Sequence, residues 1–151
     1  MSDMNTSGYM STSATSGYKS TSATSGYKST SATSGNESTS ATSGYMSTSA
    51  TSGPQSTSAT SGPQSTSATS GPQSTSATSG NCSPAVCAGL KSKAKSGPFG
   101  CIALAWWNLR EQRAEMRSAD VGIGDGTDGK LKAHVWYQLA ADTGAFEEVA
   151  P

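Results

Sequence analysis

A nonapeptide that recurs eight times without a gap constrains the fold of this chain more than any other feature. The copies run from Ser11 to Cys82; each begins with STSATSG, and only its last two residues vary. Fixed-period repetition of this kind is the sequence signature of stacked arrays such as solenoids. The repeat therefore predicts architecture, and it says almost nothing directly about activity.

Two interpretations of the repeat region compete. Its low hydrophobicity is typical of a flexible, disordered Ser/Thr/Gly-rich linker or of a glycosylated stalk, because Ala and Thr bury little apolar surface to offset the entropy lost on ordering. A strict register instead favours stacked coils, in which each residue lies on its own copy in the next coil. STSATS suits a β-strand and Gly-x-x suits a turn. Within the eight copies, proline occurs only in that turn, at Pro54, Pro63 and Pro72, where a missing N–H interrupts no ladder.

We therefore predict an all-β protein: a parallel β-solenoid, or β-roll, with two nonapeptides (18 residues) per coil and a small β-rich capping module. One nonapeptide per coil would leave almost no interior and would stack Lys19 on Lys28, whereas two stack Lys19 on Glu37. Two per coil also sort the turn residues onto two edges. One edge carries Tyr9, Tyr27, Tyr45, Pro63 and Asn81, and the other carries Tyr18, Asn36, Pro54 and Pro72.

Alternation along a strand separates a Thr-Ala-Ser face from a Ser-Ser-Thr face. The decayed ninth copy, SPAVCAGLK, places Val86 where Ala14 stands in the first copy. This substitution predicts that the Thr-Ala-Ser face is the core and that the Ser-Ser-Thr face is an outer array of hydroxyls. In the first three complete copies, the predicted outward residues are Ser11, Ser13, Thr15, Ser20, Ser22, Thr24, Ser29, Ser31 and Thr33.

The composition changes after a shortened copy, SKAKSGPF, that ends at Phe99. We divide the chain into an N-terminal partial repeat (1–10), the solenoid (11–99) and a β-rich capping domain (100–151). Residues 100–107 predict a buried strand, although their length also fits a helix, and 133–139 and 145–149 predict two more strands. The charge spacing of 110–117 fits a short helix.

The array, the segment SKAKSGPFGCIALAWW and the later KLKAHVWYQL together resemble a group of bacterial and phage-associated nonapeptide-repeat proteins. That group ends its array in a short domain of uncharacterised function. The match lies in Ser92-Lys93-Ala94-Lys95, Gly100-Cys101, Leu104-Ala105 and Trp136-Tyr137. The resemblance implies that a strand reaching Val121, rather than a helix, follows the paired tryptophans, and it implies no activity. A weaker likeness is to the β-roll heads of trimeric autotransporter adhesins.

Charge and hydropathy exclude several classes of partner. Ten basic and ten acidic residues cancel, so no net charge attracts nucleic acid or an anionic membrane. No apolar run approaches the roughly 20 residues of a membrane span. The start, MSDMNTSGYM, lacks the features of a secretory signal, so we expect a cytoplasmic or virion-associated protein. Three cysteines without CxxC spacing indicate neither a disulfide framework nor a zinc site.

The sequence does not assemble a catalytic site. His134 is the only histidine, and its apolar neighbours favour a structural role. Asp125 and Asp128 lie in a glycine-rich loop, 122–129, that lacks the spacing of a calcium or phosphate loop and predicts a solvated turn. Lys91, Lys93 and Lys95 alternate and predict a solvated edge that discourages strand addition, with anion binding left open. We expect no enzyme activity, no cofactor and no metal.

The first functional hypothesis is a non-catalytic rigid spacer or display scaffold that self-associates or enters a larger assembly; a phage or mobile-element origin comes only through the resemblance. The second is binding to ice or another crystalline surface through a Ser/Thr hydroxyl array. The third is the disordered or glycosylated stalk. No specific ligand is indicated by the sequence.

Overall fold

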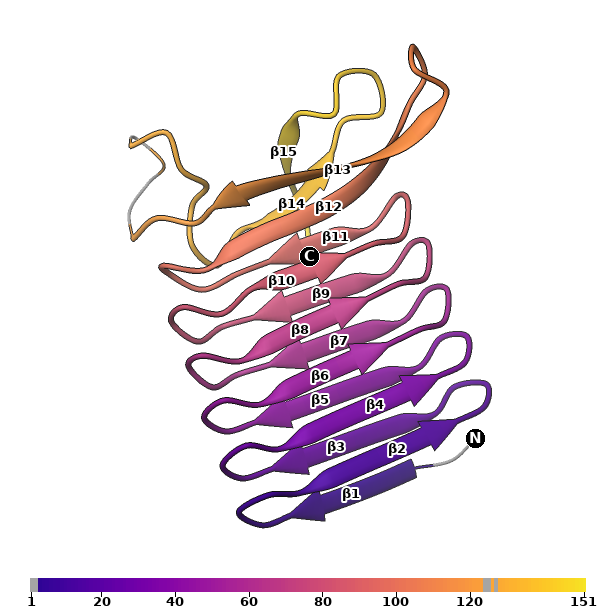
Figure 1. Cartoon of the computed structure of the whole chain (residues 1–151), viewed down its shortest axis with the longest axis vertical. Coiled ribbons are helices and arrows are strands. Elements are labelled where there is room, and N and C mark those ends of the chain that lie inside the picture. The colour runs from indigo at the N-terminus through magenta and orange to yellow at the C-terminus, as the bar shows by residue number, and fades with distance from the viewer. Residues whose placement is uncertain (1–2, 124–125, 127) are drawn as a thin grey trace.

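The computed structural model describes residues 3–123, 126 and 128–151, and in these ranges every regular element is a β-strand. Figure 1 shows a stack of flattened coils with the N-terminus at one end and two hairpins at the other. The first strands are β1 (Asp3–Ser7), β2 (Thr12–Ser16), β3 (Thr21–Ser25), β4 (Thr30–Ser34), β5 (Thr39–Ser43), β6 (Thr48–Thr51), β7 (Thr57–Thr60) and β8 (Thr66–Thr69). The remaining strands are β9 (Thr75–Thr78), β10 (Ala85–Cys87), β11 (Lys93–Lys95), β12 (Cys101–Asn108), β13 (Arg113–Asp120), β14 (Trp136–Leu139) and β15 (Phe146–Val149).

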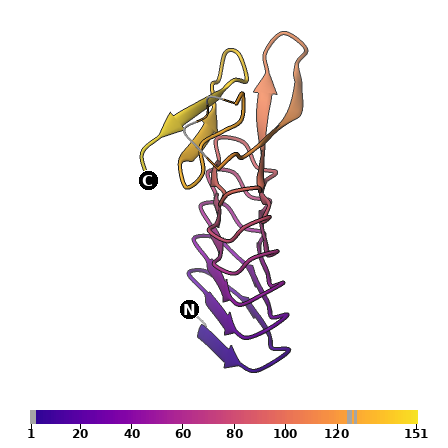
Figure 2. The same cartoon turned by 90° about the vertical axis from the view of Figure 1, so that its left-hand side faces the viewer.

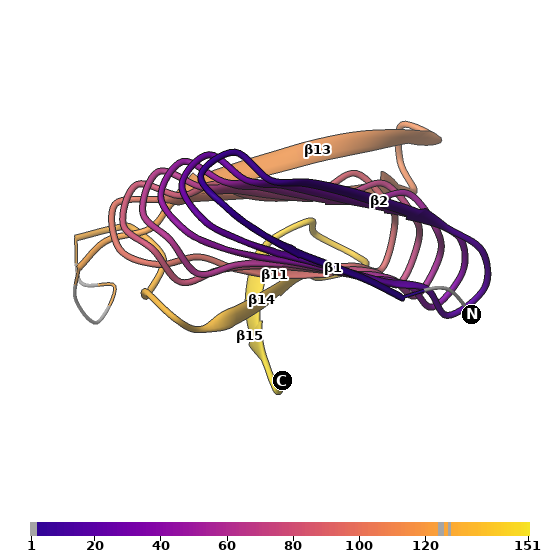
Figure 3. The same cartoon turned by 90° about the horizontal axis from the view of Figure 1, so that it is seen from below.

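Successive strands alternate between two opposed sheets. The eight-stranded sheet has the order β1-β3-β5-β7-β9-β11-β14-β15, and the seven-stranded sheet has the order β13-β12-β10-β8-β6-β4-β2. Seen along the stack, in Figure 3, the coils form flattened rings, each slightly rotated from the one before. Within the repeat region neighbouring strands are parallel, and each residue pairs with its copy 18 positions later, as Ala14 does with Ala32. The predicted β-solenoid with two nonapeptides per coil is therefore confirmed.

The turns lie on two edges as the 18-residue coil requires. On one edge the rings of Tyr9, Tyr27 and Tyr45 stack at centroid separations of 5.1 and 5.3 Å, and Met46 N–H donates to the Pro63 carbonyl. On the other edge Lys19 Nζ lies 3.2 Å from Glu37 Oε2. Both predicted sets of edge residues are confirmed.

The predicted inside face was wrong. Ser13, Ser20, Ser22, Thr24, Ser29, Ser31 and Thr33 are buried, and Ser11 and Thr15 of the first copy are half-buried. Outward positions are instead taken by the Thr-Ala-Ser face. In the ninth copy the true core positions are Ala85 and Cys87, both fully buried, while Val86 is half-buried on the outer surface.

Serine ladders explain how such a polar face fills a core. The middle serine of each copy bonds to its counterpart in the opposite sheet: Ser40 Oγ lies 2.9 Å from Ser31 Oγ, and Ser49 Oγ lies 3.0 Å from Ser40 Oγ. The first serine of each copy closes the corner, since Ser47 N–H donates to Ser65 Oγ at 3.0 Å and Ser65 Oγ donates to the Gly44 carbonyl at 3.1 Å. Small hydroxyl side chains that bond to one another allow the two sheets to lie close without leaving most of their polar groups unpaired.

The invariant glycine is required by the approach of adjacent coils. A Cβ built on Gly53 would overlap the carbonyl oxygen of Gly35, its copy in the preceding coil, and the same holds for Gly62 on Gly44. Positive φ occurs at two turn positions: at the ninth residue of each copy, with 54° at Lys19 and 56° at Gln55, and at the glycine of the first copies, with 123° at Gly17. In the first copies the glycine therefore combines a turn angle that other residues resist with the close approach of adjacent coils, and from Gly53 on the close approach alone requires it.

The C-terminal residues continue both sheets and then cover them. β12 extends the seven-stranded sheet in parallel with β10 and turns back as β13, so the alternative of a helix at 110–117 is wrong. β14 adds antiparallel to β11 and turns back as β15 around residues 142–144. Figure 2 shows the two hairpins diverging beyond the last coil. The apolar core lies between them and comprises Ala85, Cys87, Ala94, Ile102, Leu104, Trp106, Val121, Tyr137 and Leu139.

The structure places several singled-out residues in the cap. His134 is exposed in a turn with φ of 62°, and its backbone N–H donates to the Ser96 carbonyl, which agrees with a structural role. In the glycine-rich loop, Asp125 lies outside the described residues, whereas Asp128 is exposed and lies 3.9 Å from Lys130 Nζ.

Candidate functional surfaces

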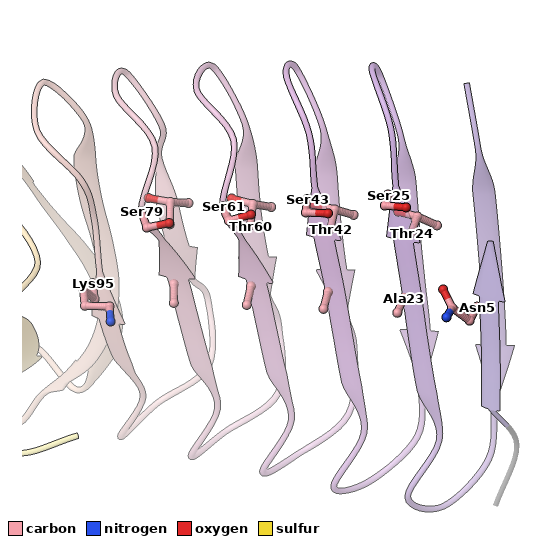
Figure 4. A pocket seen from close by; sticks show the side chains of 14 residues that line it. Asn5, Ala23, Thr24, Ser25, Thr42, Ser43, Thr60, Ser61, Ser79 and Lys95 are labelled. Atoms are coloured by element: carbon pink, nitrogen blue, oxygen red, sulfur yellow. The ribbon is translucent and has the colours of Figure 1, made fainter. Parts of the chain in front are cut away.

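Two shallow troughs run along the outside of the solenoid, one on each sheet. On the eight-stranded sheet the floor is a row of alanines, flanked by a row of exposed serines (Figure 4). The alanines are Ala23, Ala41, Ala59 and Ala77, and the serines are Ser25, Ser43, Ser61 and Ser79. The trough has a volume of about 640 Å³, with Asn5 at one end and Lys95 at the other.

The trough on the seven-stranded sheet has a volume of about 590 Å³ and no charged residue in its lining. Its floor is formed by Ala14, Ala32, Ala50, Ala68 and Val86. Both troughs present methyl groups and hydroxyls at the regular interval of stacked β-strands, about 4.8 Å. Apart from Lys95 and Asn5 at the ends of the first trough, the linings consist of Ala, Ser, Thr and Val side chains, which can bind a ligand through methyl contacts and hydroxyl hydrogen bonds.

One edge of the solenoid carries a cluster of three ionisable side chains: Tyr18, Lys19 and Glu37. Tyr18 Oη donates to Glu37 Oε1 at 2.7 Å. That hydrogen bond and the contact with Lys19 lower the pKa of the Glu37 carboxyl, while the bonds to Glu37 raise the pKa of Tyr18 and of Lys19. The cluster therefore contributes its stability near neutral pH. That contribution is lost as pH falls through the lowered pKa of Glu37 or rises through the raised pKa values of its partners.

Lys93 and Lys95 have a structural partner that the sequence did not indicate. The ammonium groups lie 5.2 and 4.7 Å from the ring centroid of Trp136, so the side chains cover that ring on the outer face of the eight-stranded sheet. Cation–π contacts of this kind are worth about 0.5–1 kcal/mol at exposed sites. The two lysines help to seat β14 on β11, so the prediction that this segment is a solvated edge that discourages strand addition is wrong.

A cavity of about 200 Å³ opens between the last turn of the solenoid and the cap. It is lined by Leu90, Lys91, Ser92, Ala105, Trp106, Trp107, Leu109, Gln138, Leu139 and Ala141. Trp106 is buried, and its indole N–H has no hydrogen-bond partner in the described part of the chain. The lining is mainly apolar, with Ser92, Gln138 and Lys91 as its polar members, and a hydrogen-bond acceptor within reach of the indole N–H would satisfy that donor.

The cysteines are free thiols and do not form a reactive centre. Burial raises the pKa of the Cys87 thiol to about 11, and burial followed by the nearby Asp120 carboxylate raises the pKa of Cys101. Both thiols are therefore protonated at neutral pH and are poor nucleophiles. Among the described residues, no group of three or more His, Cys, Asp or Glu side chains is arranged to hold a metal ion.

The sequence located neither trough, because it assigned the wrong face to the interior. The ninth copy gives no decisive signal, because it loses hydroxyls on both faces: Ala85 and Cys87 replace an inward serine and threonine, and Pro84 and Ala88 replace an outward threonine and serine. Val86 drew attention to the outward face, because it is larger than the alanine that it replaces.

Fold and surfaces together define a class: a two-sheeted β-solenoid with one end covered by β-hairpins and with a shallow trough along the outside of each sheet. Comparisons with family models, with curated proteins and with solved structures find no match to this chain. Over residues 3–123, 126 and 128–151, no helix is long and apolar enough to cross a membrane.

Proposed function

We propose that this protein is a rigid spacer or display scaffold whose solenoid sets a fixed distance and presents the same surface in every coil. The observation that carries the proposal is the unbroken 18-residue register, from Asp3↔Thr21 in the first coil to Lys95↔Ala77 in the last. Backbone ladders and the serine ladders run through the whole stack, so bending requires the breaking of many hydrogen bonds at once. The resemblance to phage-associated repeat proteins supports a place in a larger assembly.

A distance measurement tests the spacer. Spin labels on Ser25→Cys and Ser79→Cys, with the native cysteines replaced, lie three coils apart on the outer surface. For a rigid stack we expect a narrow distribution near 14 Å that lengthens to about 24 and about 34 Å when two and four copies of residues 47–64 are inserted. A flexible chain would give broad distributions near 40 Å, rising to about 52 Å for the two-coil insertion. Broad distributions of that kind would refute the spacer.

Binding to ice or to another crystalline lattice is a second candidate, now through the outward Thr-Ala-Ser face. Its support is that the outward positions are as invariant through the eight copies as the inward ones, although the core does not require those side chains. Repeated hydroxyls and methyls about 4.8 Å apart would match a periodic surface. We expect thermal hysteresis in purified protein, reduced when Ala41 and Ala59 are replaced by lysine. Absence of hysteresis at millimolar concentration would exclude ice as the ligand.

A further inference from the structure

One edge of the solenoid carries a ladder of backbone hydrogen bonds that ends in the turn 89–92. The ninth residue of each repeat on this edge donates its N–H to the eighth residue one coil further on, as Gln73 does to the Leu90 carbonyl at 2.9 Å. The next residue is a serine, and its N–H donates to the Oγ of the serine one coil further on, as Ser74 does to Ser92 at 3.0 Å. Both kinds of donor therefore point toward the C-terminal cap.

The ladder has no continuation at its last turn. Lys91 and Ser92 occupy the two donor positions there, and neither N–H has an acceptor in the described part of the chain. Figure 1 shows the reason: β12 runs on into β13 where a turn would otherwise lead to the opposite sheet, and β14 takes the next place in that sheet. The other edge of the solenoid is closed, since Cys82 N–H donates to the Pro98 carbonyl at 3.0 Å. Two adjacent N–H groups are thus left facing the cap.

These donors belong to the lining of the cavity of about 200 Å³ between the last turn and the cap. Lys91 has φ of 57°, and successive N–H groups in a turn of this kind form a concave site for an anion. The side chain of Lys91 is the one charged group of the described lining, which holds no Asp or Glu. Every other lysine has an ion pair or an aromatic ring as its partner, whereas Lys91 has neither among the described residues.

Most of the remaining lining is apolar and comes from both hairpins of the cap. Trp107 and Leu109 contribute from the first hairpin, and Leu139 contributes from the second. A cavity of about 150 Å³ with apolar walls holds a benzene ring, so the volume here accommodates one ring together with a carboxylate. Pockets for drug-sized molecules are larger, at roughly 300–1,000 Å³. The volume therefore favours a small free molecule over a peptide.

We propose that this cavity binds a small carboxylate whose hydrocarbon part is a single ring or a short branched chain. The carboxylate oxygens accept hydrogen bonds from the N–H groups of Lys91 and Ser92 and pair with the Lys91 ammonium group. The hydrocarbon part lies against Trp107, Leu109 and Leu139. Two unpaired donors and an unpaired cation account for the charge of the ligand, and the apolar walls account for the rest of it.

Titration of the ¹⁵N-labelled protein with phenylacetate tests the site, because the amide cross-peaks of Lys91 and Ser92 report on the donors themselves. We expect both cross-peaks to move downfield and to saturate with a Kd of about 1 mM or lower. Phenylacetamide, which has the same ring and no charge, should bind at least about 10-fold more weakly. Acetate, which has the charge and no ring, should also bind at least about 10-fold more weakly.

Matched lysine substitutions separate the ammonium group from the backbone donors. Lys91→Met keeps the length of the side chain and removes its charge, so it should weaken phenylacetate binding about 5-fold. Lys28→Met is the control, because Lys28 has the same φ of 57° in a turn of the opposite edge, and it should leave binding unchanged.

The proposal would be overturned by amide cross-peaks that stay in place at about 20 mM of both phenylacetate and 4-methylpentanoate, well above the expected Kd. Equal binding of phenylacetate and phenylacetamide, or equal binding by the wild type and Lys91→Met, would show that the site does not recognise the carboxylate. Equal binding of acetate and phenylacetate would show that the apolar walls play no part. None of these results depends on the role of the solenoid as a spacer.

Discussion

Gly53→Ala should destabilise the protein by at least about 3 kcal/mol, because the added methyl group would overlap the Gly35 carbonyl of the preceding coil. The obstructing atom is backbone held in a ladder, so it cannot move aside as the end of a side chain can. Gly53 does not have the left-handed φ that disfavours alanine, so the effect is steric alone. For a chain of this size the loss corresponds to a fall in Tm of about 6–12 °C.

Gly129→Ala is the matched control for this effect. Gly129 has φ of 76°, and a Cβ placed there meets nothing within 4 Å. It therefore carries the conformational penalty without the overlap, and we expect a loss of about 1 kcal/mol. Denaturant unfolding followed by circular dichroism measures both variants. A Gly53→Ala protein as stable as the Gly129→Ala protein would show that adjacent coils do not require glycine at this position.

The second large effect is that two substitutions within one strand, β6, should change the stability of the protein in opposite directions. Ser49 Oγ lies 2.8 Å from the Ser40 carbonyl and 3.0 Å from Ser40 Oγ, so Ser49→Ala removes a bond of the central ladder. We expect it to cost about 1–2 kcal/mol. Thr51 is 4% exposed and its Oγ1 has no partner in the described structure, so Thr51→Val replaces an unpaired buried hydroxyl with a methyl of the same shape. We expect a gain of about 1 kcal/mol.

Thr→Val should be stabilising in other coils too, because the fifth-position threonines at 33, 42 and 60 also have buried Oγ1 atoms without a partner in the described structure. Replacing all four threonines by valine should raise Tm by more than any single change, although neighbouring sites need not add fully. Thermal melts of the single and combined variants provide the measurement. Destabilisation by Thr51→Val would mean that its hydroxyl is bonded in solution, and the serine ladder would then not be the sole polar network of the core.

The different hydrogen bonding of Ser49 and Thr51 also explains why the core face was misassigned from sequence. Hydrophobicity alone favours Ala over Ser as an interior residue, and Val86 strengthened that choice. The energetics depend instead on whether each hydroxyl has a partner across the sheets, which requires knowledge of the distance between the sheets. That distance follows from the small size of the side chains on both faces and from the turn geometry, neither of which periodicity reports.

Local sequence information was sufficient to predict other features. The restriction of proline to Gly-x-x indicated the turn, and the charges at Lys19 and Glu37 favoured an 18-residue coil over a nine-residue coil. The cap strands at 100–107 and 145–149 followed from apolar and β-branched runs. The contacts of Lys93 and Lys95 with Trp136 were not predictable in the same way, because they join segments about 40 residues apart.

The repeat by itself determined the strand, the turn, the number of residues per coil and the two edges, because each of these follows from a period along one dimension. Only the tertiary structure decided which face is buried and where the outer troughs lie. These features depend on how two sheets approach each other. The structure thus accounts for four of the invariant letters of STSATSG: the inward serines and threonine form the core, and the glycine allows the close approach of adjacent coils. The outward threonine, alanine and serine are equally invariant, although the core does not require them.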